Sequence, residues 1–93
     1  MTMNLKLVTF DLDNTQFLVD EENESDAIDF AIKANKSGVC GPFSESSDYG
    51  LTKEEAEDIA NYTVEEVDME MLAAICLRND YIGCVNEVIV FNG

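Results

Sequence analysis

The chain has 93 residues, of which 20 are acidic and 5 basic, with no histidine, so its formal net charge is -15. This length predicts a single domain over residues 1–93, and the 46% hydrophobic content separates the chain from acidic disordered tails. A surface this negative repels nucleic acid and anionic lipid. The charge therefore excludes direct binding to either and favours a protein partner with a basic, nucleic-acid-binding surface.

The cysteines and the N-terminal residues predict a cytoplasmic protein, located in the host cytoplasm if a phage encodes it. The first residues lack a signal peptide's basic and apolar regions, and the apolar runs are too short to span a bilayer. Cys40, Cys76 and Cys84 show no metal-binding spacing, and no histidine completes a zinc site. We expect reduced thiols, with Cys76 and Cys84 in the core and Cys40 the most exposed.

Residues 5–19 are predicted to form a β-hairpin. Asp13 and Asn14 are residue types that tolerate the positive φ of a tight turn. A two-residue turn there places apolar side chains opposite each other on one face, which favours strand pairing. The expected register pairs Leu12 with Thr15, Phe10 with Phe17, and Val8 with Val19.

A charged connection over residues 20–24 precedes a predicted helix. Asn23 or Ser25 is its expected N-cap, and Gly38 is its expected stop. Residues at helical spacing form its core stripe: Ala27, Ile28, Ala31 and Ile32, widened by Phe30 and Ala34. Beyond it, residues 39–45 are predicted to form a short edge strand, and residues 46–50 a loop.

Residues 52–91 predict further helices and a closing strand. A capping box opens at Thr52 and starts a helix to about residue 61, with Ala56, Ile59 and Ala60 facing inward. Two alternatives follow: another helix from Thr63, or an extended piece to residue 67 with residue 68 capping a helix. Both give the same apolar stripe of Met71, Leu72, Ile75 and Cys76. Residues 81–83 are expected to form a turn, and residues 85–91 an inner strand.

This order of elements predicts an α+β domain. We expect a small antiparallel or mixed sheet, made from the N-terminal hairpin and the C-terminal strand, with two or three helices on one face.

Residues 7–15, with Asp11 and Asp13, resemble the first motif of haloacid dehalogenase-type phosphatases. The resemblance implies that Asp11 is a nucleophile, that Asp13 is an acid/base, and that Mg²⁺ is bound. The rest of the chain departs from that family. Gln16 replaces an apolar residue, the later Ser/Thr and acidic motifs are missing, and the doubly wound core needs a longer chain. We therefore predict no catalytic residues and no enzyme activity.

The same residues also match part of a calcium-binding loop. Asp11, Asp13, Thr15 and Glu22 have the spacing of oxygen ligands in a twelve-residue EF-hand. Gln16 stands where that loop requires glycine, however, and the flanking residues are typical of strands. We predict no dedicated metal site and no cofactor.

Two acidic runs are the predicted partner-binding residues. Ordinary helix surfaces mix charges to relieve repulsion, whereas these runs contain almost no lysine. Halophilic adaptation is an alternative origin of such acidity. The predicted residues are Asp20, Glu21, Glu22, Glu24, Asp26, Asp29, Glu54, Glu55, Glu57, Asp58, Glu65, Glu66, Asp68 and Glu70.

In size, charge and fold class the chain resembles the small acidic inhibitors of phages and mobile elements, including anti-restriction and anti-CRISPR proteins of the DNA-mimic type. The resemblance implies that carboxylates take the place of phosphates in a basic cleft of a host defence protein. A generic acidic adaptor or regulatory module is the alternative, and a phosphatase-like or metal-dependent enzyme is the third hypothesis.

Overall fold

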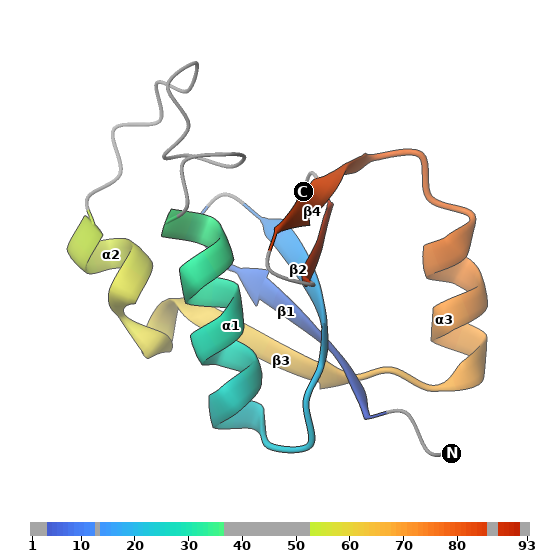
Figure 1. Cartoon of the computed structure of the whole chain (residues 1–93), viewed down its shortest axis with the longest axis horizontal. Coiled ribbons are helices and arrows are strands. Elements are labelled where there is room, and N and C mark those ends of the chain that lie inside the picture. Colours follow the sequence, from blue (N-terminus) through green and yellow to red (C-terminus); the bar gives the residue numbers. More distant parts are fainter. Residues whose placement is uncertain (1–3, 13, 37–52, 86–87, 92–93) are drawn as a thin grey trace.

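The computed structural model describes residues 4–12, 14–36, 53–85 and 88–91. Its strands form one five-stranded sheet in the order β3-β1-β2-β5-β4, and every pairing is antiparallel (Figure 1). This confirms the α+β class, and β5 lies inside the sheet, as predicted for the closing strand. The elements are β1 (Leu5–Phe10), β2 (Thr15–Asp20), α1 (Glu24–Lys36), α2 (Lys53–Glu57), a 3-10 turn (Ile59–Asn61), β3 (Tyr62–Glu66), α3 (Met69–Cys76), β4 (Tyr81–Val85) and β5 (Val88–Phe91).

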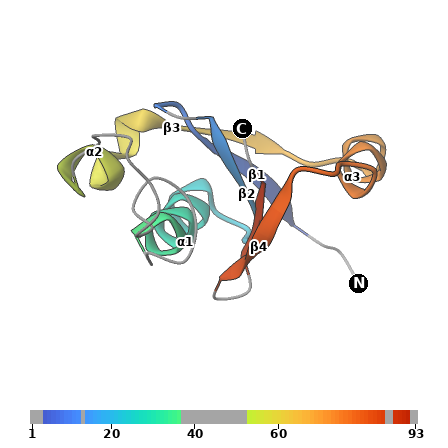
Figure 2. The same cartoon turned by 90° about the horizontal axis from the view of Figure 1, so that it is seen from above.

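The main core lies between one face of the sheet and α1 with α2 (Figure 2). Alternation along the strands turns one set of apolar side chains toward the helices. The stripe of α1 that packs against them consists of alanines, whose small side chains allow the helix to lie close to the sheet. The buried residues are Val8, Phe10, Phe17, Val19, Ala27, Ala31, Ala34, Ala56, Tyr62, Val88 and Val90.

A smaller core lies on the opposite face of the sheet. Leu7, Leu18 and Phe91 form one buried cluster there with Ile75 of α3. Figure 2 shows α3 at the far side of the molecule from α2. Two helices therefore share one face, as expected, and the third packs on the other.

The hairpin register differs from the predicted one by two residues. Phe10 pairs with Thr15, and Val8 pairs with Phe17. The connection is longer than a two-residue turn because Asn14, at φ 64°, closes it by donating from its backbone N–H to the Phe10 carbonyl at 2.8 Å. Because side chains alternate with a period of two, this shift leaves the predicted residues on their predicted faces.

The helix expected up to residue 61 ends at Glu57. Asp58 has an extended backbone conformation, and its carboxylate accepts a hydrogen bond from the Ala60 N–H, so the chain continues as a 3-10 turn. Ala56 is buried as predicted, whereas Ile59 and Ala60 are exposed. The predicted capping residue Thr52, the helix stop Gly38, Cys40 and the strand and loop expected over 39–50 lie outside the described residues.

The extended alternative is confirmed for residues 62–66, and Asp68 caps α3. The turn expected at 81–83 is wrong, because these residues begin β4 and the register irregularity between Tyr81 and Gly83 lies within that strand. The strand expected over 85–91 is divided between β4 and β5. Cys76 and Cys84 are exposed rather than buried.

Candidate functional site

The sheet register brings the ends of the two acidic runs together. The first residues of β1 lie between the last residues of β2 and β3, so Leu5 pairs with Asp20 and Lys6 pairs with Glu66. Backbone hydrogen bonds extend this arrangement beyond the strands. The Glu21 N–H donates to the Asn4 carbonyl at 3.1 Å, and the Val67 N–H donates to the Leu5 carbonyl at 3.0 Å. Neighbouring strands lie about 4.8 Å apart, so the backbones of β2 and β3 lie roughly 10 Å apart on either side of β1. Asp20 and Glu66 themselves lie on opposite faces of the sheet, because their partners Leu5 and Lys6 alternate along β1.

We call this cluster the acidic end of the sheet. It combines the end of β2, the connection to α1 with the first residue of that helix, the end of β3 and the start of α3, which lie along the lower side of Figure 1. All its side chains are exposed except that of Glu21, which is half-buried. Its residues are Asp20, Glu21, Glu22, Glu24, Glu65, Glu66, Asp68 and Glu70.

The lysine at the acidic end is covered. The Lys6 side chain is only 5% exposed, and its Nζ lies 3.8 Å from Oε1 of Glu66, whose own side chain is 84% exposed. Other described cations lie elsewhere: Lys36 pairs with Glu57, and Arg78 pairs with Asp80. The acidic end therefore presents carboxylates to solvent, while its lysine is covered and paired with Glu66.

Backbone contacts hold two of these carboxylates in place. Oδ1 of Asp20 accepts a hydrogen bond from the Asn4 N–H at 3.2 Å. Oδ1 of Asp68 accepts one from the Met71 N–H at 2.8 Å, which caps α3. Fixed groups of this kind lose less conformational entropy when a partner binds.

The other predicted acids do not join this cluster. Asp26 and Asp29 lie on the exposed side of α1. The remaining group lies around α2, before the start of β3, and is separated from the acidic end by the length of that strand. Within this group, Glu57 pairs with Lys36, and Asp58 caps the 3-10 turn. The members of the group are Glu54, Glu55, Glu57 and Asp58.

Asp11, the nucleophile implied by the phosphatase resemblance, lies in the β1–β2 connection. Its carboxylate accepts from the Thr63 hydroxyl at 3.0 and 3.1 Å, and its N–H donates to the Asn61 carbonyl at 2.8 Å. These contacts attach the connection to β3. The antiparallel sheet is also not the doubly wound core that the resemblance implies.

Asp13, the implied acid/base, lies outside the described residues. Within the part of the chain that is described, no group of three or more acidic or cysteine side chains is arranged to hold a metal ion.

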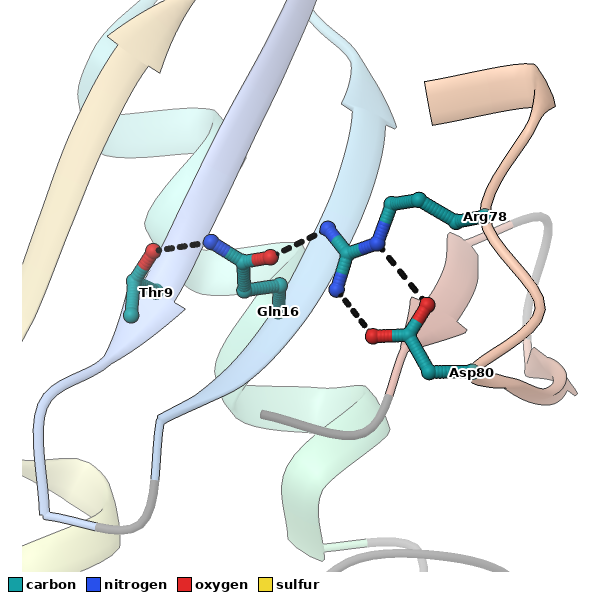
Figure 3. Close-up of polar contacts among 4 residues, drawn as sticks. All are labelled: Thr9, Gln16, Arg78 and Asp80. Atoms are coloured by element: carbon teal, nitrogen blue, oxygen red, sulfur yellow. Dashed lines mark hydrogen bonds and ion pairs between the residues drawn. The ribbon is translucent and has the colours of Figure 1, made fainter. Parts of the chain in front are cut away.

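A polar network that was not predicted from the sequence crosses the second face of the sheet, the one on which α3 packs (Figure 3). Gln16 donates to the Thr9 hydroxyl at 3.2 Å and accepts from Arg78, whose guanidinium also donates to both oxygens of Asp80. The hydrogen bonds from Arg78 lower the pKa of Asp80 below its ordinary value, against an opposing contribution from desolvation. Gln16, a polar residue in an apolar strand, was the feature of the sequence that could have indicated this network. Its partner Arg78, however, is 62 residues away.

The Arg78 guanidinium also lies over the ring of Phe91, 4.6 Å from its centroid. Phe91, Leu18 and Ile75 belong to the lining of an apolar groove of about 650 Å³ between the sheet and α3. The groove is the second surface feature that sequence reasoning missed, because its walls come from distant parts of the chain.

Among the described helices, none has both the length and the apolar character needed to cross a bilayer. Comparisons with protein-family models, curated proteins and solved structures find no match to this chain.

Proposed function

We propose that this protein is an inhibitor that binds a basic nucleic-acid-handling protein and occupies its nucleic-acid site, in the manner of anti-restriction and anti-CRISPR proteins that mimic DNA. The observation that carries the proposal is the acidic end, where carboxylates from both sequence runs come to one end of the sheet and the lysine there is covered and paired with Glu66. A cleft that binds phosphates uses lysine and arginine, and fixed carboxylates offer the same charge to those side chains.

The net charge of -15 supports the same partner. Complementary charge accelerates encounter with a basic surface and makes association depend on salt. Because the charge is spread over many groups, and each exposed pair contributes at most about 1 kcal/mol, single substitutions should have small effects. A test therefore requires combined substitutions.

The test compares two sets of charge reversals of equal size. One variant carries Glu22→Lys, Glu24→Lys and Glu65→Lys at the acidic end. The control carries Asp26→Lys, Asp29→Lys and Glu54→Lys, which are exposed residues outside it. Nucleic-acid-binding proteins captured from a bacterial lysate at low salt are purified. Competition with a labelled DNA duplex and association rates are then measured at several salt concentrations.

We expect the wild-type chain to displace the duplex from a captured protein. The acidic-end variant should associate about tenfold more slowly, with a flatter salt dependence. The association rate of the control variant should fall much less. Binding without displacement would instead support an acidic adaptor. If the association rate fell equally in both variants, the overall charge would act without a defined site, and the proposal would be overturned.

A further inference from the structure

The apolar groove between α3 and the sheet has a shape and chemistry suited to apolar side chains. Its floor is formed by strand residues and one wall by the helix, and it has a volume of about 650 Å³. Tyr81 is 57% exposed and Ile89 is 36% exposed along it. The lining residues are Leu5, Leu18, Leu72, Ile75, Cys76, Arg78, Tyr81, Cys84, Ile89 and Phe91.

The two ends of this groove differ in charge. At one end, Asp20 lies two residues beyond Leu18 on the same face of β2, and it is the cross-strand partner of Leu5. On the helix side, Asp68 precedes Leu72 by one helical turn, since the Leu72 N–H donates to the Asp68 carbonyl at 2.9 Å. The groove therefore opens at this end onto the acidic end of the sheet.

The other end of the groove is close to neutral. Arg78, the cation among the lining residues, donates hydrogen bonds to Asp80 and to Gln16 (Figure 3). Its charge is balanced by the Asp80 carboxylate. The groove thus combines an apolar floor with negative charge at one end.

This charge distribution indicates which kind of ligand the groove can bind. Negatively charged ligands are repelled by a chain of net charge -15, and a second copy carries the same charge. A segment with apolar side chains on one face and lysine or arginine beside them satisfies both the groove and its acidic end. Binding of an amphipathic helix in a hydrophobic groove is a recurrent mode of protein recognition.

We infer that this groove binds a basic amphipathic helix of the partner protein. The inference rests on the proposed function, because the basic residues of that helix are taken to meet the acidic end. The apolar stripe of the helix occupies the space between Leu72 of α3 and Ile89 of β5. Its lysines or arginines contact Asp20 and Asp68.

The probe is a labelled 18-residue peptide of leucine and lysine with leucines at helical spacing. A peptide of the same composition with its order scrambled is the first comparison, and one with glutamate in place of lysine is the second. Affinity is measured by fluorescence anisotropy at physiological salt. The test variant is Leu72→Ser in the groove wall, and its matched control is Met69→Ser, an 80% exposed apolar residue of the same helix outside the lining.

Affinity for the amphipathic peptide should exceed that for either comparison peptide by at least about tenfold. Leu72→Ser should weaken it by roughly tenfold, as expected for losing the burial of one leucine, and Met69→Ser should leave it unchanged. In the wild-type chain, bound peptide should slow alkylation of Cys76 and Cys84, which line the groove and are exposed. This protection, mapped by mass spectrometry, tests the site even if Leu72→Ser does not fold.

Several results would overturn the groove assignment. These are equal affinity for the ordered and scrambled peptides, tight binding of the glutamate peptide, unprotected cysteines, or a wild-type dimer that Leu72→Ser dissociates. The acidic-end variant separates the two proposals. The ordered and the scrambled lysine peptides could bind the wild-type chain with equal affinity, and the acidic-end variant could lower both affinities equally. That result would support the acidic end and not the groove. If the variant lowers neither affinity while the ordered peptide still protects the cysteines, the groove is supported and the acidic end is not.

Discussion

The side-chain amide of Asn35 donates a 3.0 Å hydrogen bond to the hydroxyl of Tyr62, and both residues are buried. The same hydroxyl donates to the Ala56 carbonyl at 2.5 Å. This chain of contacts joins α1 to α2 and β3, with Asn35 and Tyr62 lying 27 residues apart in the sequence. The ring of Tyr62 also stacks on Phe10 of β1, with centroids 5.0 Å apart. The helices on this face of the sheet are therefore joined through one tyrosine.

Replacing Tyr62 with phenylalanine should lower the free energy of unfolding by about 1–3 kcal/mol. The change removes the hydroxyl that serves both Asn35 and Ala56 while retaining the ring. Urea unfolding followed by circular dichroism measures the effect. The matched control is Tyr81→Phe at an exposed tyrosine, which should change stability by less than about 0.5 kcal/mol. Similar small effects in both variants would show that the buried hydroxyl contributes no net stability.

Removing the helix cap at Asp68 should also destabilise the protein. Asp68→Ala deletes the carboxylate that accepts from the Met71 N–H, and we expect a loss of about 1 kcal/mol. Asp29→Ala, at an exposed acid within α1, removes the same charge without removing a cap. The difference between the two variants in thermal or urea unfolding isolates the capping contribution. No difference would contradict the assigned cap.

The Arg78–Asp80 pair predicts a pH-dependent contribution to stability. Because the folded-state pKa of Asp80 is lowered by Arg78, the unfolded-state pKa is the higher of the two. The contribution is therefore complete above about pH 4 and is lost as pH falls through the lower folded-state pKa. Asp80→Asn should be less stable than wild type at pH 7, and this difference should narrow below about pH 4. Urea unfolding across this range checks the prediction, and a difference that grows on acidification would contradict it.

Asp11 should contribute structure rather than phosphatase chemistry. Asp11→Asn alters the acceptor for the Thr63 hydroxyl at an exposed position, so the free energy of unfolding should fall by no more than about 1 kcal/mol. We expect no hydrolysis of p-nitrophenyl phosphate in magnesium that depends on Asp11. Hydrolysis by the wild-type chain that Asp11→Asn abolishes would establish the enzyme hypothesis instead.

Local patterns account for the parts of the fold that were predicted correctly. The alternation in residues 5–19 specified which side chains share a face, and the helical spacing of Ala27 and Ala31 specified the buried side of α1. Asp68 was predicted as a cap under one of two alternatives because capping uses a short, local hydrogen bond. The hairpin register was missed because a turn's length depends on backbone angles, such as that of Asn14, which residue type only biases.

The exposure of Cys76 and Cys84 depends on packing that no local pattern contains. Both are apolar enough for a core, but both lie along the open groove beside α3. The groove exists because α3 packs on the second face of the sheet chiefly through Ile75. Its walls come from strands and a helix that are far apart in the sequence.

The sequence by itself determined the sign and amount of charge, the two acidic runs, the α+β class and the faces of the first strands, since each depends on composition or on short periodic spacing. Tertiary structure alone decided which acids lie at the same end of the sheet. With β1 paired between β2 and β3, Asp20 and Glu66 come to the same end of the sheet, whereas Glu54 and Asp58 lie before the other end of β3. Strand order follows from which distant apolar faces bury each other best, and it therefore depends on contacts across the whole chain.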